Sequence, residues 1–138
     1  MFGLKRVRGG VHPDGHKDES RDLPILTDIP LPPLLTLPLC QHSGSDAMPL
    51  VQEGDYVLKG QKIAKADGRM SANIHAPTSG FIKSIQQVTM PHPSGLPARA
   101  ILIEPDGKDE WIELNPPENP YALAHEDLAS LVEDAGIV

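Results

Sequence analysis

Short apolar runs alternate with turn residues between Leu34 and Trp111, and this alternation predicts a small β domain. Glycine, proline or an Asp-Gly pair separates most of the runs. Strands of about four to eight residues with such breaks between them are typical of sandwiches and barrels. We expect strands over residues 34–41, 48–52, 56–59, 61–66, 73–76, 80–89, 99–105 and 110–114.

The chain on the N-terminal side of this region is predicted to form an irregular, extended arm over residues 1–33. Residues 1–22 are polar and leave room for one short strand, whereas residues 23–39 carry five prolines among many leucines. Proline at this density excludes a helix and interrupts the hydrogen bonds of a sheet. The proline-rich stretch must therefore be extended, and we expect its leucines to lie on an apolar surface.

Residues 115–138 change in character after the β domain of residues 34–114, because apolar residues recur at helical spacing from Tyr121 onward. The helix begins either at an Asn119 cap followed by proline or nearer His125, and Gly136 has the place of a C′ glycine. An amphipathic helix of about three turns is marginal alone and needs a partner surface. We therefore interpret this segment as a linker and the first helix of a following domain that is cut short.

Charge is unevenly distributed along the chain, and this distribution argues against nucleic acid as a partner. The net charge is −7, and residues 99–138 hold ten Asp or Glu against two Lys or Arg. Such an acidic segment repels phosphates and otherwise forms a solvated face. Because no run of about 18 apolar residues occurs, we expect no membrane span.

The metal-binding side chains of the sequence do not form a recognisable ligand set. The single cysteine, Cys40, cannot form an internal disulfide or hold an iron–sulfur cluster, and it is predicted to be a small buried residue. His12 and His16 are four residues apart, but Pro13 between them prevents a helix. No cysteine or carboxylate cluster accompanies them at zinc spacing. No metal site is therefore expected.

Residues 54–63 and 76–82 fit the two halves of a cofactor-carrier frame. The first half reads G-D-x-V-x-x-G-Q-x-I, whose two glycines permit turns of positive φ around a short strand. The second half reads A-P-x-x-G-x-I. Val57 and Ile63 are predicted to face inward. The frame is similar to that of biotinyl and lipoyl carriers, a flattened barrel also described as a barrel-sandwich hybrid, and we expect this mainly β fold.

The residue that would carry a cofactor is missing from this frame. Carriers present a lysine at the tip of the hairpin between the two halves, and the corresponding position is Met70 counted from Gly60, or Arg69 counted from Pro77. Methionine has no amine and arginine stays protonated, so neither forms an amide with biotin or lipoate. Lys65 lies too early in the hairpin. We predict an unmodified frame that serves by its shape; the alternative is a stand-alone carrier or small-ligand-binding module.

No catalytic residue is expected from the sequence. Ser79 with His75 as its base would need a third orienting group and an oxyanion site, and residues 78–80 are more simply interpreted as a hydrogen-bonded turn. His12, His42 and His75 are expected to tie loops to backbone carbonyl groups.

Five motifs in register resemble the C-subunit family of the Rnf electron transport complex over nearly the whole chain. They are G-G-V-H-P at 9–13 followed by Lys17, Q-H-x-G at 41–44, the two halves of the carrier frame, and A-G-I-V at 135–138. In the family, A-G-I-V leads into a glycine-rich flavin- and nucleotide-binding loop. The residues that carry the resemblance, which we expect to be structural, are Gly9, Gly10, His12, Pro13, Lys17, Gln41, His42, Gly54, Asp55, Gly60, Gln61, His75, Pro77, Ser79 and Gly80.

The resemblance implies a peripheral subunit on the cytoplasmic side of the bacterial inner membrane. The complex of this family passes electrons between NADH and ferredoxin and couples their transfer to ion movement. The resemblance also implies FMN, an NADH site and two [4Fe–4S] clusters in the full-length subunit, whereas this chain itself is expected to hold no cofactor. We therefore expect a non-catalytic scaffold or docking module. Its partners would be the other subunits of the complex and the missing C-terminal domains of its own chain.

Overall fold

The computed structural model describes residues 15–26, 29–68, 70–91 and 93–137. The chain forms two compact units, Met1–Pro30 and Leu31–Val138. Some residues singled out in the sequence lie outside the described part of the chain. These are Gly9, Gly10, His12 and Pro13 of the first motif and Arg69 at the expected hairpin tip.

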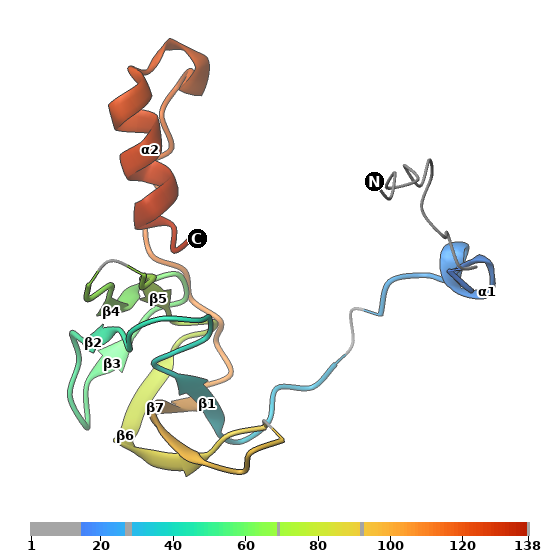
Figure 1. The fold of residues 1–138 in the computed structure, drawn as a ribbon, viewed down its shortest axis with the longest axis vertical. Coiled ribbons are helices and arrows are strands. Elements are labelled where there is room, and N and C mark those ends of the chain that lie inside the picture. The colour runs from blue at the N-terminus through green and yellow to red at the C-terminus, as the bar shows by residue number, and fades with distance from the viewer. Residues whose placement is uncertain (1–14, 27–28, 69, 92, 138) are drawn as a thin grey trace, which may run out of the picture. The chain divides into compact units, whose positions relative to one another are not determined.

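The first unit contains one turn of helix where the sequence suggests irregular structure or a short strand. α1 (Asp18–Arg21) begins after Lys17, and Arg21 forms an ion pair with Asp18 (Figure 1). Side chains three residues apart meet on a helix, so this pair favours a helical turn in a polar segment. The expected strand is therefore wrong for the described residues 15–22.

The proline-rich stretch divides into an exposed half and a packed half. Five aliphatic side chains of the first half are between 51 % and 90 % exposed, and these are Leu23, Ile25, Leu26, Ile29 and Leu31. The expectation that these side chains lie on an apolar surface stays a prediction, and the prolines among them remove the backbone donors that a sheet would need. After Leu34 the chain joins a sheet, and Leu35 and Leu37 pack against the core.

Two antiparallel sheets form the framework of the second unit (Figure 1). The four-stranded sheet has the order β1 (Leu35–Pro38), β7 (Pro97–Pro105), β6 (Gly80–Thr89) and β3 (Tyr56–Val57). The three-stranded sheet has the order β2 (Met48–Pro49), β4 (Lys62–Lys65) and β5 (Ile74–His75). Side chains of both sheets share one hydrophobic cluster, so the predicted mainly β fold is confirmed.

The core follows from the period-two pattern of the longer strands. Ile82, Ile101 and Ile103 from the β6–β7 hairpin are at most 1 % exposed and meet Val57 and Ile63, which are fully buried as predicted. The register of β6 against β7 shifts by a bulge after Ile82, and bulges increase the local twist of a sheet. The hairpin can thus curl around the core.

The predicted strand over residues 110–114 is wrong. Only Trp111 pairs there, in a single parallel bridge to Lys59. Lys59 donates its N–H to Glu110 and accepts from Ile112. Gly60 follows with φ +80, so the partner backbone turns away after one residue and the ladder cannot continue.

Both starts considered for the C-terminal helix occur in the structure. The Asn119 side chain accepts from the backbone N–H of Tyr121 and caps the 3-10 turn η1 (Pro120–Ala122), whereas α2 (His125–Asp134) begins later. Gly136 ends α2 with φ +76 and donates to the Glu133 carbonyl, while the next N–H reaches the carbonyl of Val132. This is the predicted C′ glycine. Among the described residues, no helix has the length and apolar character to cross a membrane.

Candidate functional site

Four of the predicted motif residues, Gln41, His42, His75 and Pro77, line one groove of about 790 Å³. The rest of the lining comes from β1, from residues around β5 and from Gly136 after α2. Because β1 and β5 are edge strands of their sheets, the groove lies between two sheet edges. The fold therefore gathers three motif segments that are far apart in sequence.

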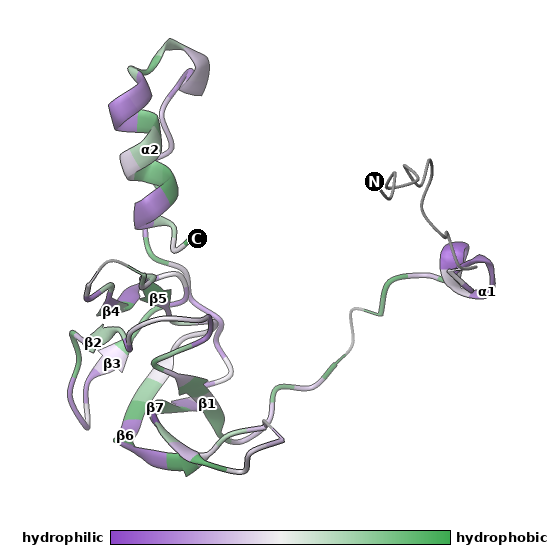
Figure 2. Ribbon diagram, in the orientation of Figure 1, coloured by the Kyte–Doolittle hydropathy of each residue, from purple (hydrophilic) through white to green (hydrophobic). Residues whose placement is uncertain are grey.

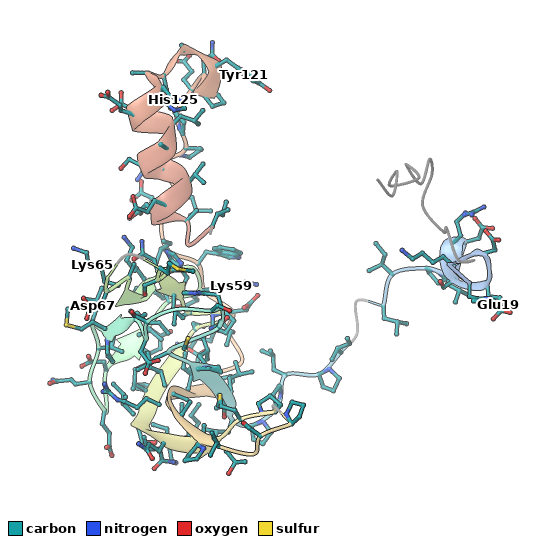
Figure 3. The ribbon with its side chains drawn as sticks, in the orientation of Figure 1. Glu19, Lys59, Lys65, Asp67, Tyr121 and His125 are labelled. Carbon is teal, nitrogen blue, oxygen red and sulfur yellow. The ribbon has the colours of Figure 1, made fainter. Side chains whose placement is uncertain are left out.

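The tip of the β4–β5 hairpin, where a carrier would present its lysine, is tied through its backbone to a second loop, while the Met70 side chain stays 59 % exposed. The backbone N–H of Ser45 donates to the Met70 carbonyl over 2.9 Å. A Cβ at Gly44 would lie 2.0 Å from that same oxygen, so only glycine fits at this position. This close approach explains the glycine of the Q-H-x-G motif. Lys65 and Asp67 project from the same hairpin (Figure 3).

The carrier-frame glycines and their neighbours form turns. The Gln52 N–H donates to the Asp55 carboxylate over 2.8 Å, next to Gly54 with φ +90. The Leu58 N–H donates to the side-chain oxygen of Gln61 over 3.0 Å and closes the second turn. The side chains of Asp55 and Gln61 thus accept hydrogen bonds from the backbone of these turns.

Thr78 and Ser79 hold the turn at residues 106–110 through buried hydroxyl groups. Ser79 Oγ donates to Asp106 over 2.7 Å and accepts from the Glu110 N–H over 3.0 Å. Thr78 Oγ1 donates to Asp109 over 2.9 Å, and both hydroxyl residues are fully buried. The sequence predicts the turn at Thr78-Ser79, but it gives no sign of partners about thirty residues away.

The electrostatics of this turn keep its two aspartates ionised. The backbone N–H of Lys108 lowers the pKa of Asp106 most, and the hydroxyls of Ser79 and Tyr56 lower it further. Hydrogen bonds from Lys59 and then from Thr78 lower the pKa of Asp109.

The same contacts raise the pKa of Tyr56. The hydrogen bond from Tyr56 to Asp106 is the first cause of a tyrosine pKa raised to about 12. Ser79 donates its hydroxyl hydrogen to Asp106, whose lowered pKa makes it a weak base for activating a serine. The hydrogen bonds of Ser79 within the described residues join it to Asp106 and Glu110 and not to His75.

The histidines of the groove differ in their surroundings. The ring Nδ1 of His42 lies 3.0 Å from the Ser43 carbonyl, which is the loop contact expected from the sequence. Burial, followed by the positive charge of Lys62, lowers the pKa of His75, and Asp134 opposes this shift. Cys40 is half-buried rather than buried, and its thiol donates to the carbonyl of His42 over 3.0 Å.

The residues present do not fit the cofactors implied by the family. A [4Fe–4S] cluster takes four thiolates, and the chain has one cysteine. Within the described segments, no three His, Cys, Asp or Glu side chains come together as a metal site. The groove lining contains no lysine or arginine to meet the phosphate of FMN.

Comparison with known proteins identifies a matching family. The model of the RnfC barrel sandwich hybrid domain matches residues 5–108. The chain is 49 % identical over 132 residues to the C subunit of the ion-translocating oxidoreductase complex from Rhodobacter capsulatus, covering 96 % of this chain and 25 % of the relative. The protein of the same name from Haemophilus influenzae is 45 % identical over 130 residues, 94 % of this chain and 16 % of the relative.

A relative from Clostridium ljungdahlii carries a more specific name. It is the C subunit of the proton-translocating ferredoxin:NAD(+) oxidoreductase complex, 44 % identical over 136 residues, which are 98 % of this chain and 29 % of the relative. The chain thus spans between 16 % and 29 % of the length of these three relatives.

Proposed function

The chain belongs to the family of RnfC barrel sandwich hybrid domains, and from this premise we propose that it is a non-catalytic scaffold and docking module of an ion-translocating electron transport complex. The observation that carries the proposal is a hairpin tip that has a methionine in place of an amine and is held by a backbone hydrogen bond. A carrier has to offer its tip to a modifying enzyme and then to distant active sites. Here the tip backbone is bonded to Ser45 and its side chain is that of Met70.

The other motif residues of the frame support a structural role for the barrel. The motif side chains Asp55, Gln61, Thr78 and Ser79 are all engaged in turns and loop contacts. Their chemistry is therefore used to hold the barrel together. A barrel of fixed shape can position neighbouring parts of an assembly without taking part in electron transfer.

The partners we propose are the other subunits of the complex and further domains of the same subunit. The names of the relatives describe members of a multi-subunit complex, and the relatives are several times longer than this chain. We further propose residues 1–33 as an arm, residues 34–114 as the barrel, and residues 115–138 as a linker and first helix toward a flavin- and NADH-binding domain.

FMN and the two [4Fe–4S] clusters of the full-length subunit would be held outside this chain, whose single cysteine and groove lining do not suit them. We propose that the module lies on the cytoplasmic side of the bacterial inner membrane as a peripheral part of the complex. The full subunit would pass electrons between NADH and ferredoxin.

Co-purification tests the docking role. The tagged chain is produced in its native host, membranes are solubilised in mild detergent, and the captured proteins are identified by mass. Other subunits of the complex should be retained by the tagged chain. The control bait is Gly80→Leu, because even a Cβ at this position would lie 2.3 Å from the Glu104 carbonyl oxygen. Recovery of the folded chain without any of those subunits would refute the proposal.

A further inference from the structure

The described part of α2 meets the barrel at its C-terminal end, and we propose that this contact is a latch, centred on Asn73, that sets the direction of α2. The latch consists of Lys62, Asn73, Asp134 and Gly136. α2 buries none of its side chains, and no residue of α2 belongs to the hydrophobic core cluster. Helix and barrel are therefore joined by a small polar contact.

Asn73 binds both partners at once. Its side-chain oxygen accepts from the backbone N–H of Ala66 over 2.8 Å and so holds the β4–β5 hairpin. Its side-chain amide donates to the carbonyls of Glu133, at 3.1 Å, and of Asp134, at 3.4 Å. The partners fix the orientation of the amide, because a backbone N–H needs an acceptor and a carbonyl needs a donor.

The helix end supplies the groups that this amide recognises. The last four carbonyls of an α-helix have no partner within the helix, and a C′ glycine turn satisfies only some of them. Asn73 completes this set from outside the helix. Lys62 adds an ion pair with Asp134, which places a positive charge where the helix dipole favours one.

Gly136 brings the backbones of the two elements together. A Cβ at this position would lie 2.5 Å from the Asn73 carbonyl oxygen and 3.6 Å from Nδ1 of His75. Its φ of +76 also disfavours any side chain. Gly136 of the A-G-I-V motif thus lies close to Asn73 and to His75, the first residue of the H-A-P-T-S-G motif.

α2 depends on this latch for its order. Its apolar side chains Leu128, Leu131 and Val132 are 41 % to 45 % exposed, and Figure 2 shows hydrophobic and hydrophilic residues alternating along the helix. A helix of ten residues is unstable alone in water. Opening the latch should therefore unfold α2 while the barrel stays intact, and this holds whatever partner the module docks to.

Hydrogen exchange on the whole chain tests the latch. Asn73→Asp keeps the acceptor for Ala66 but removes the donor to α2, and it places a negative charge beside the helix carbonyls. Exchange of the amides in residues 128–135 should rise about tenfold or more, whereas amides of β6 and β7 should keep their rates. Asn119→Asp is the matched control, because it makes the same change of charge and keeps its cap acceptor; it should leave both sets unchanged.

Gly136→Ala provides a second route to the same result, because it separates the two backbones without touching Asn73. It should also speed exchange in α2 alone. Unchanged protection of α2 in Asn73→Asp would overturn the proposal. So would the joint unfolding of barrel and helix in both variants, because the helix would then be an integral part of the barrel.

Discussion

Single glycines determine where the chain can make its closest contacts. At Gly80 an added Cβ would lie 2.3 Å from the Glu104 carbonyl oxygen, whereas at Gly54 nothing lies within 4 Å and only the φ of +90 calls for glycine. The two positions look alike in the sequence. They therefore separate the cost of steric overlap from the cost of backbone conformation.

Gly80→Ala should lower the free energy of unfolding by roughly 3 kcal/mol, because β6 and β7 must move apart. Gly54→Ala should cost about 1–2 kcal/mol, the usual penalty of a left-handed conformation. Urea unfolding followed by Trp111 fluorescence measures both values. Equal losses of unfolding free energy in the two variants would show that the steric overlap at position 80 adds no cost beyond that of the backbone conformation.

The aspartates of the 106–110 turn predict how stability depends on acid. The pKa values of Asp106 and Asp109 are lowered in the folded protein. Their contribution is therefore present above about pH 4 and is lost as the pH falls through the folded values. The urea midpoint of the native protein should drop as the pH falls below about 4. In the variant with Asp106→Asn and Asp109→Asn, the urea midpoint should be lower than in the native protein at neutral pH and should fall less in acid. An equally steep fall would contradict this account.

At the scale of elements, local patterns predict which runs form strands but not which strands find a neighbour. The runs that contain β6 and β7 match the structure closely because they form a long hairpin, whereas residues 110–114 find only Lys59. The groove and the latch depend on contacts between distant segments, such as Asn73 with Asp134, 61 residues apart. No short-range signal marks such pairs.

The backbone contact at the hairpin tip leads to a prediction about modification. Met70→Lys restores an amine at the tip, but the Ser45 contact to the backbone at this position should still keep biotin and lipoate ligases from binding the hairpin. We expect intact mass spectrometry to show no adduct after incubation with either ligase, while an authentic carrier domain is fully modified. Efficient modification of this variant would mean that only the lysine was missing and that the Ser45 contact does not hinder the ligases.

At the scale of the molecule, the chain combines a barrel whose motif side chains are hydrogen-bonded in its own turns with a helix whose apolar face is partly exposed. Acidic residues outnumber basic residues by ten to two in the last forty positions, which include this helix. Composition and motifs were sufficient to predict the mainly β barrel and the family. The path of the proline-rich stretch was not predictable, because leucines and prolines of the same pattern lie outside the sheets before Leu34 and form β1 after it.

The mass of the polypeptide from its native host tests most directly whether the barrel serves by shape. The protein is purified from host membranes without denaturation, and the masses of its proteolytic peptides from within this sequence are compared with the masses calculated for them. We predict the unmodified masses, within the error of the instrument. A biotin- or lipoate-sized addition on any residue would contradict the scaffold role and favour a carrier.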